Sequence, residues 1–324
     1  MKIYSFLKIS IITLLLVLLV GLLGMECLAK DFPSKTIEII VPFSTGGGTD
    51  VYVRALAREV SEVLGVDVVI INLSGAESLR GLGVAANAKP DGYTLAAFNP
   101  PSSPLAQMRL NPPFDLRDFT PIVRYTIDSL VVMVRDDFPY NYKEMYEAYE
   151  RGEIETIAHV GGIQKATVSL LKKKCNLQWK REIVYPGGSD LVLALLQNEV
   201  PVAVTPTGTA IGPVKDGLIK VLAVLSDERH PVLPEIKTHI EWGFESISIV
   251  GGQSRIIAGP PGMPEDIQKI LENAFLKALE SERLKNLAEK TGKVYIPGNA
   301  QVAGKAIKDS FLIGNFINLE ELFK

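Results

Sequence analysis

The chain has 324 residues, of which 47% are hydrophobic and 22% are charged, and its formal net charge is −3. These values describe an ordinary soluble globular protein. The negative net charge argues against a nucleic-acid partner, because phosphate binding takes most of its affinity from lysine and arginine. Any anionic ligand must therefore be held by local features rather than by a general positive field.

The N-terminus has the features of a cleavable secretory signal. Lys2 and Lys8 precede an apolar run over residues 9–23, which is shorter than the roughly 20 residues needed to span a bilayer core. Cys27-Leu28-Ala29 then places small residues at −3 and −1 of a cleavage site. We predict a signal peptide over residues 1–29 and an exported, extracytoplasmic protein.

Two alternatives remain open for this segment: a retained N-terminal anchor, and a lipoprotein with lipidated Cys27. Met25-Glu26 before the cysteine is a poor match to the small residues that a lipidation site needs. Cys175 would be the sole cysteine of the mature chain, which rules out an intrachain disulfide. No histidine motif lies near it, so we interpret it as a structural residue rather than a nucleophile.

From Ile37 onward the chain alternates strands and helices. The apolar stretch 37–41 predicts a buried strand, and a helix then extends to about Leu64, capped by Thr49 or Asp50 at its start and by Gly65 at its end. The remaining predicted elements of this first set are a strand over 66–73, a short helix over 81–88 and a strand over 93–98. Such a β-α-β-α-β unit implies a parallel sheet.

A second set follows. Its predicted strands cover 154–160, 182–185, 200–205 and 219–225, with helices extending to about Lys173 and Asn198. One more strand over 255–258 and two long helices over 264–291 and 301–316 close the chain. Two α/β sets indicate two lobes, with ligand binding in the crevice outside the carboxyl ends of the strands.

Two glycine-rich loops, residues 44–50 and 186–190, each connect a strand to a helix. A helix N-terminus offers unpaired N–H groups and partial positive charge, and glycine lets a ligand approach the backbone, which suits a carboxylate or phosphate. Asp50 and Asp190 would be helix caps, or acceptors for a ligand ammonium or hydroxyl group. Structural turns remain the alternative for both loops.

Known catalytic and nucleotide-binding patterns are missing. Gly48 is followed by Thr49-Asp50 rather than the Lys-Ser/Thr of a phosphate-binding loop, and consecutive glycines do not have dinucleotide-binding spacing. The chain offers no nucleophile elbow and no Ser–His–acid set. His159, His230 and His239 lack metal-ligand spacing. We therefore predict no catalytic residue, no cofactor and no metal, and a protein that is not an enzyme.

Five ordered motifs resemble the extracytoplasmic receptors of tripartite tricarboxylate transporters, the Bug-type binding proteins. The opening motif is Phe32-Pro33-Ser34-Lys35 followed by residues 39–50. The others are residues 88–95, 185–189, 217–238 and 258–264. The resemblance covers nearly the whole mature chain.

This resemblance implies an α/β fold of the type II-like periplasmic binding protein class, with two lobes joined by two crossing strands and a ligand cleft between them. We expect lobe 1 to comprise residues 30–128 and 232–324, and lobe 2 to comprise residues 129–231. The lobes would close on the ligand like a Venus flytrap. The resemblance also implies capture of a di- or tricarboxylate, an acidic amino acid or an aromatic acid by a monomer that serves membrane transporter subunits. A periplasmic sensor subunit is the alternative.

Three departures from the family pattern bear on the ligand. The loop after the second strand contains Glu77 and Arg80, which would either pair with each other or offer Arg80 to a ligand carboxylate. Gln164 would contact ligand, Lys165 would be solvated, and Thr205 replaces a frequent aspartate. The predicted ligand-binding residues are Ser44, Thr45, Gly46, Gly47, Thr49, Asp50, Asn99, Gly162, Gln164, Gly187, Gly188, Ser189, Asp190 and Thr205.

Overall fold

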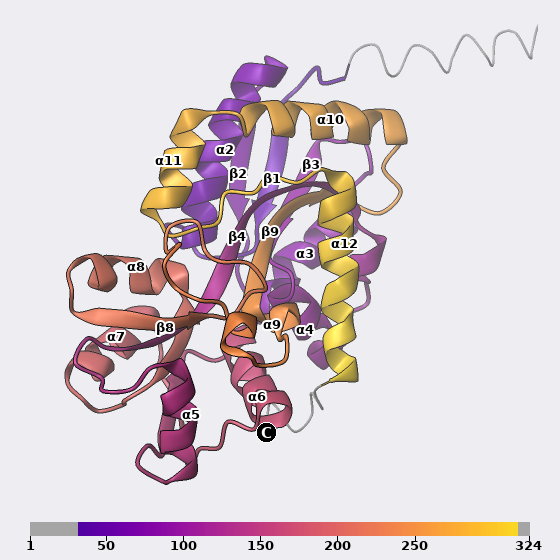
Figure 1. Ribbon diagram of the computed structural model, residues 1–324. Helices are drawn as coiled ribbons and strands as arrows, with labels where there is room; N and C mark the ends of the chain where they lie inside the picture. Colours follow the sequence, from indigo (N-terminus) through magenta and orange to yellow (C-terminus); the bar gives the residue numbers. More distant parts are fainter. Residues whose placement is uncertain (1–31, 317–324) are drawn as a thin grey trace, which may run out of the picture.

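The computed structural model describes residues 32–316 (Figure 1). The predicted signal peptide and Cys27 lie outside the described residues. Within residues 32–316, none of the helices combines the length and the apolar character that a membrane crossing requires.

The first lobe is built on a sheet in the order β2-β1-β3-β9. Its first elements are β1 (Ile37–Val41), α2 (Gly48–Leu64), β2 (Val68–Asn72), α3 (Leu79–Ala86) and β3 (Thr94–Phe98). β1 pairs in parallel with both β2 and β3, which confirms the predicted parallel unit. Gly65 ends α2 with φ 71°, as its predicted role as a left-handed cap requires.

A single long strand, β4 (Thr120–Arg135), runs from one lobe into the other. Residues 120–129 pair antiparallel with β9 (Gly252–Gly259), whereas residues 130–135 pair with β7 (Ala203–Pro206) and β8 (Ile219–Val224). The change of partners falls between Ser129 and Leu130. Figure 1 shows β4 extending from the upper sheet toward β8 of the lower lobe.

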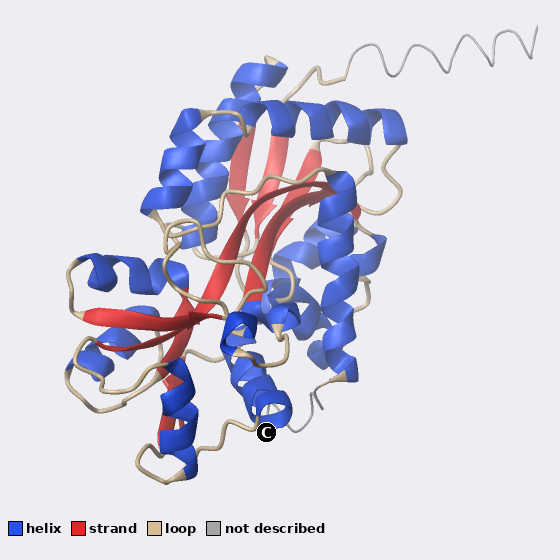
Figure 2. Ribbon diagram, viewed as in Figure 1, coloured by secondary structure: helices blue, strands red, loops and turns tan. Residues whose placement is uncertain are grey.

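The second lobe contains the remaining strands and helices of the middle of the chain. They are α5 (Tyr142–Glu150), β5 (Thr156–His159), α6 (Ile163–Cys175), β6 (Arg181–Val184), α7 (Gly188–Leu196) and α8 (Thr207–Lys215). β5 pairs in parallel with β6 and with β7. Figure 2 shows the strands of the two lobes running in different directions, with helices covering each sheet. The chain therefore has the predicted two-lobed α/β fold.

Each lobe has a hydrophobic core, and the second-lobe core also takes in Leu105 of α4 (Ser102–Leu110) and Ile313 after α12 (Ala300–Ser310). In the first lobe, Ile39, Leu56 and Phe275 are fully buried between the sheet and the helices above it. In the second lobe, Tyr142 and Leu170 belong to a core that also includes Ile247 and Val250, just before the return into β9. The predicted lobe boundaries stay a prediction, and this packing places the segment before β9 against α5 and α6.

The C-terminal helices differ from those predicted. The expected helix over 264–291 is two helices, α10 (Glu265–Ala278) and α11 (Glu282–Lys290), because the chain turns at Ser281, whose backbone is extended. That turn allows Leu284 of α11 to join the core beside α2. The expected helix over 301–316 is α12 (Ala300–Ser310) followed by a short 3₁₀ turn.

Four helices were not predicted at all: α5 and α8 of the second lobe, and two others at the ends of first-lobe strands. α4 (Ser102–Leu110) follows β3, and α9 (Ser248–Gly251) precedes β9. Gly251 lies against the end of β8, where a Cβ atom would be 1.7 Å from the carbonyl oxygen of Leu225. Only glycine allows this close approach of two chain segments between the lobes.

Candidate functional site

A cleft of about 660 Å³ opens between the lobes at the carboxyl ends of their strands. Its first-lobe wall follows β1 and β2 and includes α4. Its second-lobe wall consists of the turn after β5 and the end of β6. The lining residues are Pro42, Phe43, Ser44, Ser74, Gly75, Glu77, Ser78, Ser102, Leu105, Arg109, Gly161, Gly162, Ile163, Lys165 and Val184. The structure thus has a cleft where the predicted topology places one.

Two helices begin at this cleft, one from each lobe. α4 starts at Ser102 and α6 starts at Ile163, and the residues before them, Pro101 and Gly162, make no side-chain cap. Both N-termini therefore direct partial positive charge toward the same space. At α4 Pro104 has no N–H and Ser103 N donates to the carbonyl oxygen of Asn99 at 3.2 Å, and at α6 Gln164 N donates to that of Gly161 at 3.2 Å. Gly162, with φ 54°, holds a backbone conformation that strongly favours glycine.

The charged side chains of the cleft come from both walls. Arg109 of α4 forms an ion pair with Glu77, and Lys165 of α6 lines the opposite wall. The expected pair of Glu77 with Arg80 is wrong: Arg80 instead donates to the carbonyl oxygen of Ser74 at 3.4 Å. The reason is the loop before α3, which turns Glu77 toward α4.

In the loop over residues 44–50, Ser44 lines the cleft, whereas Asp50 points into the protein. The Asp50 carboxylate accepts hydrogen bonds from Gly46 N at 2.8 Å, Asn72 Nδ2 at 2.8 Å and Arg54 Nε at 3.0 Å. Burial opposes ionisation of Asp50, but these donors outweigh it and lower the carboxyl pKa. Asp50 therefore braces the loop from behind. Thr45, Gly46 and Gly47 lie beside Ser44 but do not line the cleft.

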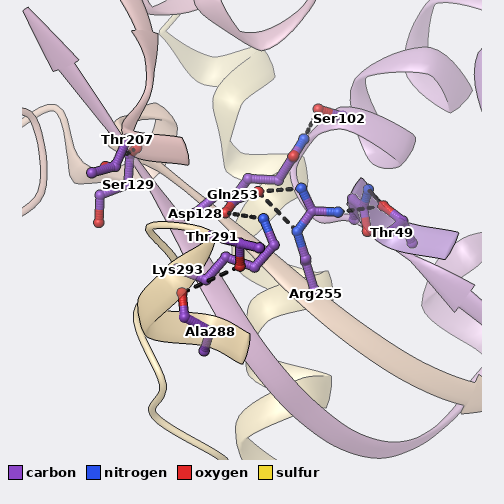
Figure 3. A network of polar contacts seen from close by, with 11 residues as sticks. Thr49, Ser102, Asp128, Ser129, Thr207, Gln253, Arg255, Ala288, Thr291 and Lys293 are labelled. Carbon is purple, nitrogen blue, oxygen red and sulfur yellow. Dashed lines mark hydrogen bonds and ion pairs between the residues drawn. The ribbon is translucent and has the colours of Figure 1, made fainter. Parts of the chain in front are cut away.

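Thr49 and Asn99 belong to a buried polar network behind this loop. Figure 3 shows Thr49 of this network beside Arg255, Asp128 and Lys293. The Thr49 hydroxyl accepts from Asn99 Nδ2 at 3.1 Å and also from Arg255. Arg255 Nε donates to Asp128 Oδ2 at 2.8 Å, and Lys293 Nζ donates to Asp128 Oδ1 at 3.0 Å. Two cations and one carboxylate are buried together, which leaves a net positive charge behind the loop.

The second-lobe residues divide into two groups. Gly162 lines the cleft together with Ile163 and Lys165, whereas the half-buried Gln164 does not. Lys165, expected to be a solvated helix residue, is half-buried in the cleft wall. Thr205 is fully buried on β7 and lies outside the cleft lining.

The loop over 187–190 begins α7 and also lies outside the cleft lining. At Gly188 a Cβ atom would be 2.8 Å from the Thr209 side chain, so this glycine is required where α7 packs on α8. Ser189 and Asp190 are exposed, and Gly187 is half-buried. Ligand contacts of Gly187, Gly188, Ser189 and Asp190 stay predictions.

His159 supports the second-lobe wall of the cleft from behind. The fully buried imidazole accepts from Gly161 N at Nδ1 (2.8 Å), which leaves its proton on Nε2, and Nε2 donates to Glu182 at 2.9 Å. The hydrogen bond from His159 lowers the pKa of Glu182 against the opposing effect of burial. The turn at Gly161 is thereby fixed to the strands below it.

Arg109 is the main cleft residue that the sequence did not reveal. No helix was predicted after β3, because Pro100-Pro101 obscured the start of α4. Ser74, Ser78 and Ser102 were missed because a lone serine carries no pattern. The topology is the signal that could have found these residues, because a helix that directly follows a strand of either lobe begins at the edge of the sheet where the cleft lies.

Similarity to known proteins agrees with this geometry. Over residues 52–317 the chain matches the family described as tripartite tricarboxylate transporter family receptor. A UPF0065 protein of Bordetella pertussis is 32% identical over 263 residues, which cover 77% of this chain and 78% of that protein.

Two solved structures show the same fold. A TctC solute binding protein from Polaromonas has a TM-score of 0.78 at 24% identity, covering 88% of this chain and all (100%) of that one. MatC from Rhodopseudomonas palustris, solved with bound malate, has a TM-score of 0.67 at 23% identity, covering 90% of this chain and 100% of that one. The predicted resemblance is confirmed: the chain belongs to the tripartite tricarboxylate transporter receptor family, whose members are solute-binding receptors and not enzymes.

Proposed function

We propose that this protein is an extracytoplasmic receptor that captures a small carboxylate between its lobes and delivers it to the membrane subunits of a tripartite transporter. Family membership supports the receptor role. The role also needs an exported protein, which the predicted signal peptide over residues 1–29 would supply. The receptor would act as a monomer, and one chain is sufficient to line the cleft.

The observation that carries the carboxylate assignment is the charge arrangement of the cleft. Two helix N-termini and two cationic side chains, Arg109 and Lys165, converge on it from opposite walls, against the single carboxylate of Glu77. Hydroxyl groups of Ser44, Ser74 and Ser102 add hydrogen-bonding capacity. An anion is stabilised by each of these features, even though the whole chain has a net charge of −3.

Lobe closure would complete the site. β4 changes partners between Ser129 and Leu130, so a small rotation there would move the second lobe over the first. We propose that closure brings the loop over 187–190 and the region of Thr205 nearer to the ligand. Exclusion of water would then strengthen the contacts to the carboxylate.

A ligand panel measured by thermal shift tests this function. The protein starting at Lys30 is heated with succinate, malate, citrate, glutamate, adipate and benzoate; malate is included because MatC was solved with it. A true ligand at a hundredfold excess over its Kd stabilises the fold by about 2.7 kcal/mol. The matched controls are the corresponding amides, which keep the shape and lose the charge. Equal shifts with acids and amides would argue against a carboxylate receptor.

A further inference from the structure

Glu77 and Arg109 form an ion pair inside the ligand cleft, although they come from separate elements 32 residues apart. Glu77 lies in the loop before α3, and Arg109 lies near the end of α4. Both residues line the space that the proposed function assigns to the ligand. The cleft therefore already contains one carboxylate paired with one of its cations.

The loop that carries Glu77 has an unusual backbone. Gly75, Ala76, Glu77 and Ser78 all have positive φ, at 130°, 47°, 52° and 84°. A left-handed backbone at three consecutive non-glycine residues is sterically costly, and such conformations persist only where surrounding contacts impose them. Ser78 supplies one such contact, because its buried hydroxyl donates to Ser103 Oγ at 3.0 Å. The loop is held in a strained form that directs Glu77 at Arg109.

The pair is weak enough to be replaced. The Glu77 side chain is 56% exposed and that of Arg109 is 29% exposed, and exposed ion pairs contribute little net stability because water screens them. A ligand carboxylate enclosed by both lobes would meet Arg109 with less water around it, where the same type of pair is stronger. The ligand would also gain Lys165 from the other wall.

We propose that Glu77 acts as an internal carboxylate that occupies Arg109 in the empty receptor, and that a carboxylate group of the ligand displaces it. This inference rests on the proposed function and adds to it the residue that binds the anion. It assigns the ligand to organic acids whose carboxylate accepts both N–H groups of a guanidinium fork. The displaced Glu77 would let the loop over 75–78 relax.

The test compares two opposite substitutions. Glu77→Gln removes the competing carboxylate and keeps the side-chain shape, so acids should bind more tightly by about 1.4- to fivefold, the range expected for loss of an exposed ion pair. Arg109→Met keeps the apolar stem and removes the guanidinium, so affinity should fall at least about tenfold. In the double variant, Glu77→Gln should lose its effect. Titration calorimetry with succinate, malate and adipate measures all three.

Asp137→Asn is the matched control, because Asp137 also pairs with an arginine, Arg135 at 2.6 Å, at an exposed site outside the cleft. It should leave acid binding unchanged. Thermal unfolding of every variant confirms that the fold is intact. Acid binding by Glu77→Gln but not by the wild type would also support the proposal, because it would show that Glu77 blocks the site.

Two outcomes would overturn the proposal, and they are distinguishable. If the wild type binds an acid and Glu77→Gln binds it no more tightly, or Arg109→Met binds it equally well, the receptor function stands and the displacement does not. If neither the wild type nor Glu77→Gln binds any of the acids, both the displacement and the carboxylate assignment are wrong.

Discussion

Asp128 of β4 and Arg255 of β9 are joined at the centre of the molecule, where Arg255 Nε donates to Asp128 Oδ2 at 2.8 Å. The same carboxylate accepts from Lys293 Nζ at 3.0 Å, and all three residues are buried. Burial disfavours the charged carboxylate, but the two cations outweigh it and lower the pKa of Asp128. This one carboxylate ties the β4–β9 pair to the segment after α11.

Asp128→Asn should therefore destabilise the protein strongly. The substitution leaves Arg255 and Lys293 buried without their counter-charge, and breaking a buried pair in this way costs about 3–5 kcal/mol. Urea unfolding measures the change in the free energy of unfolding. Asp137→Asn, at an exposed ion pair, is the control and should change stability by no more than about 0.5 kcal/mol. Equal effects of the two substitutions would contradict the structural role of the network.

Gly81 is required for the first-lobe wall of the cleft. A Cβ atom there would lie 2.7 Å from the carbonyl oxygen of Leu73 and 2.9 Å from Cβ of Pro42. Gly81→Ala should therefore cost about 1–3 kcal/mol as α3 is pushed from the sheet. At Gly48, in the first turn of α2, the nearest atom to a Cβ would be Lys293 Nζ at 3.9 Å. Gly48→Ala should be neutral or stabilising by up to about 1 kcal/mol. Urea unfolding measures both variants, and a Gly48→Ala protein less stable than Gly81→Ala would contradict the close packing at Gly81.

His239 should make stability fall in mild acid. Burial lowers the pKa of this histidine from 6.5 to about 4, and its Nδ1 lies 2.7 Å from the hydroxyl of Tyr142. Because the folded pKa is depressed, protons bind the unfolded state more readily between the two values. The contribution of neutral His239 to the free energy of unfolding is thus complete above pH 6.5. It is lost as the pH falls toward 4, by roughly 3 kcal/mol in total, and stability changes no further through this group at lower pH.

The check is the free energy of unfolding from pH 8 to pH 4 for the wild type and His239→Gln. The variant keeps a hydrogen-bond acceptor for Tyr142, and its free energy of unfolding should depend less steeply on pH than that of the wild type. Burial also lowers the pKa of His230, so some slope should remain. Identical profiles of variant and wild type would contradict the assignment to His239.

Cys175 should react slowly with thiol reagents in the folded protein. Burial, followed by the charge of Glu245, raises the pKa of the thiol to about 11, and Sγ lies 3.2 Å from His239 Nε2. Only the thiolate reacts, so alkylation by iodoacetamide at pH 8 should be about a hundredfold slower than in the unfolded chain. Mass spectrometry follows the adduct, with urea-unfolded protein as the control. Equal rates in both states would contradict the raised pKa of this partly buried thiol.

The alternating part of the fold was predictable from sequence because each strand–helix unit has its own local signals. β1, the body of α2 and Gly65 match their predicted roles, since branched apolar runs and a left-handed glycine act within a few residues. The predicted cap at Thr49 or Asp50 is wrong, because α2 already begins at Gly48 and its N-cap residue, Gly47, makes no side-chain cap. β4 was missed although it is the longest strand of the described chain. It contains Pro121 and the buried Asp128, and its stability depends on partners distant in sequence.

The candidate site was predictable in position but only partly in composition. The loops at Ser44 and Gly162 line the cleft as expected from their places after β1 and β5. The role of Asp50 was ambiguous, because a carboxylate at a helix start either caps the helix, contacts a ligand or turns inward. Asp50 turns inward because Asn72 and Arg54 donate hydrogen bonds to it there. Arg109 could not be identified, because its importance arises only when α4 is placed opposite α6.

The most direct test of a carboxylate receptor is the binding stoichiometry of the best acid from the panel to a protein with a blocked cleft. Ser74→Trp places a large ring in the cleft from an exposed position, and Lys89→Trp places the same ring on an exposed turn outside the cleft lining. Calorimetry should show one acid bound per wild-type or Lys89→Trp chain, and none per Ser74→Trp chain. Unchanged binding to Ser74→Trp, with all three proteins folded, would show that the acid does not bind between the lobes.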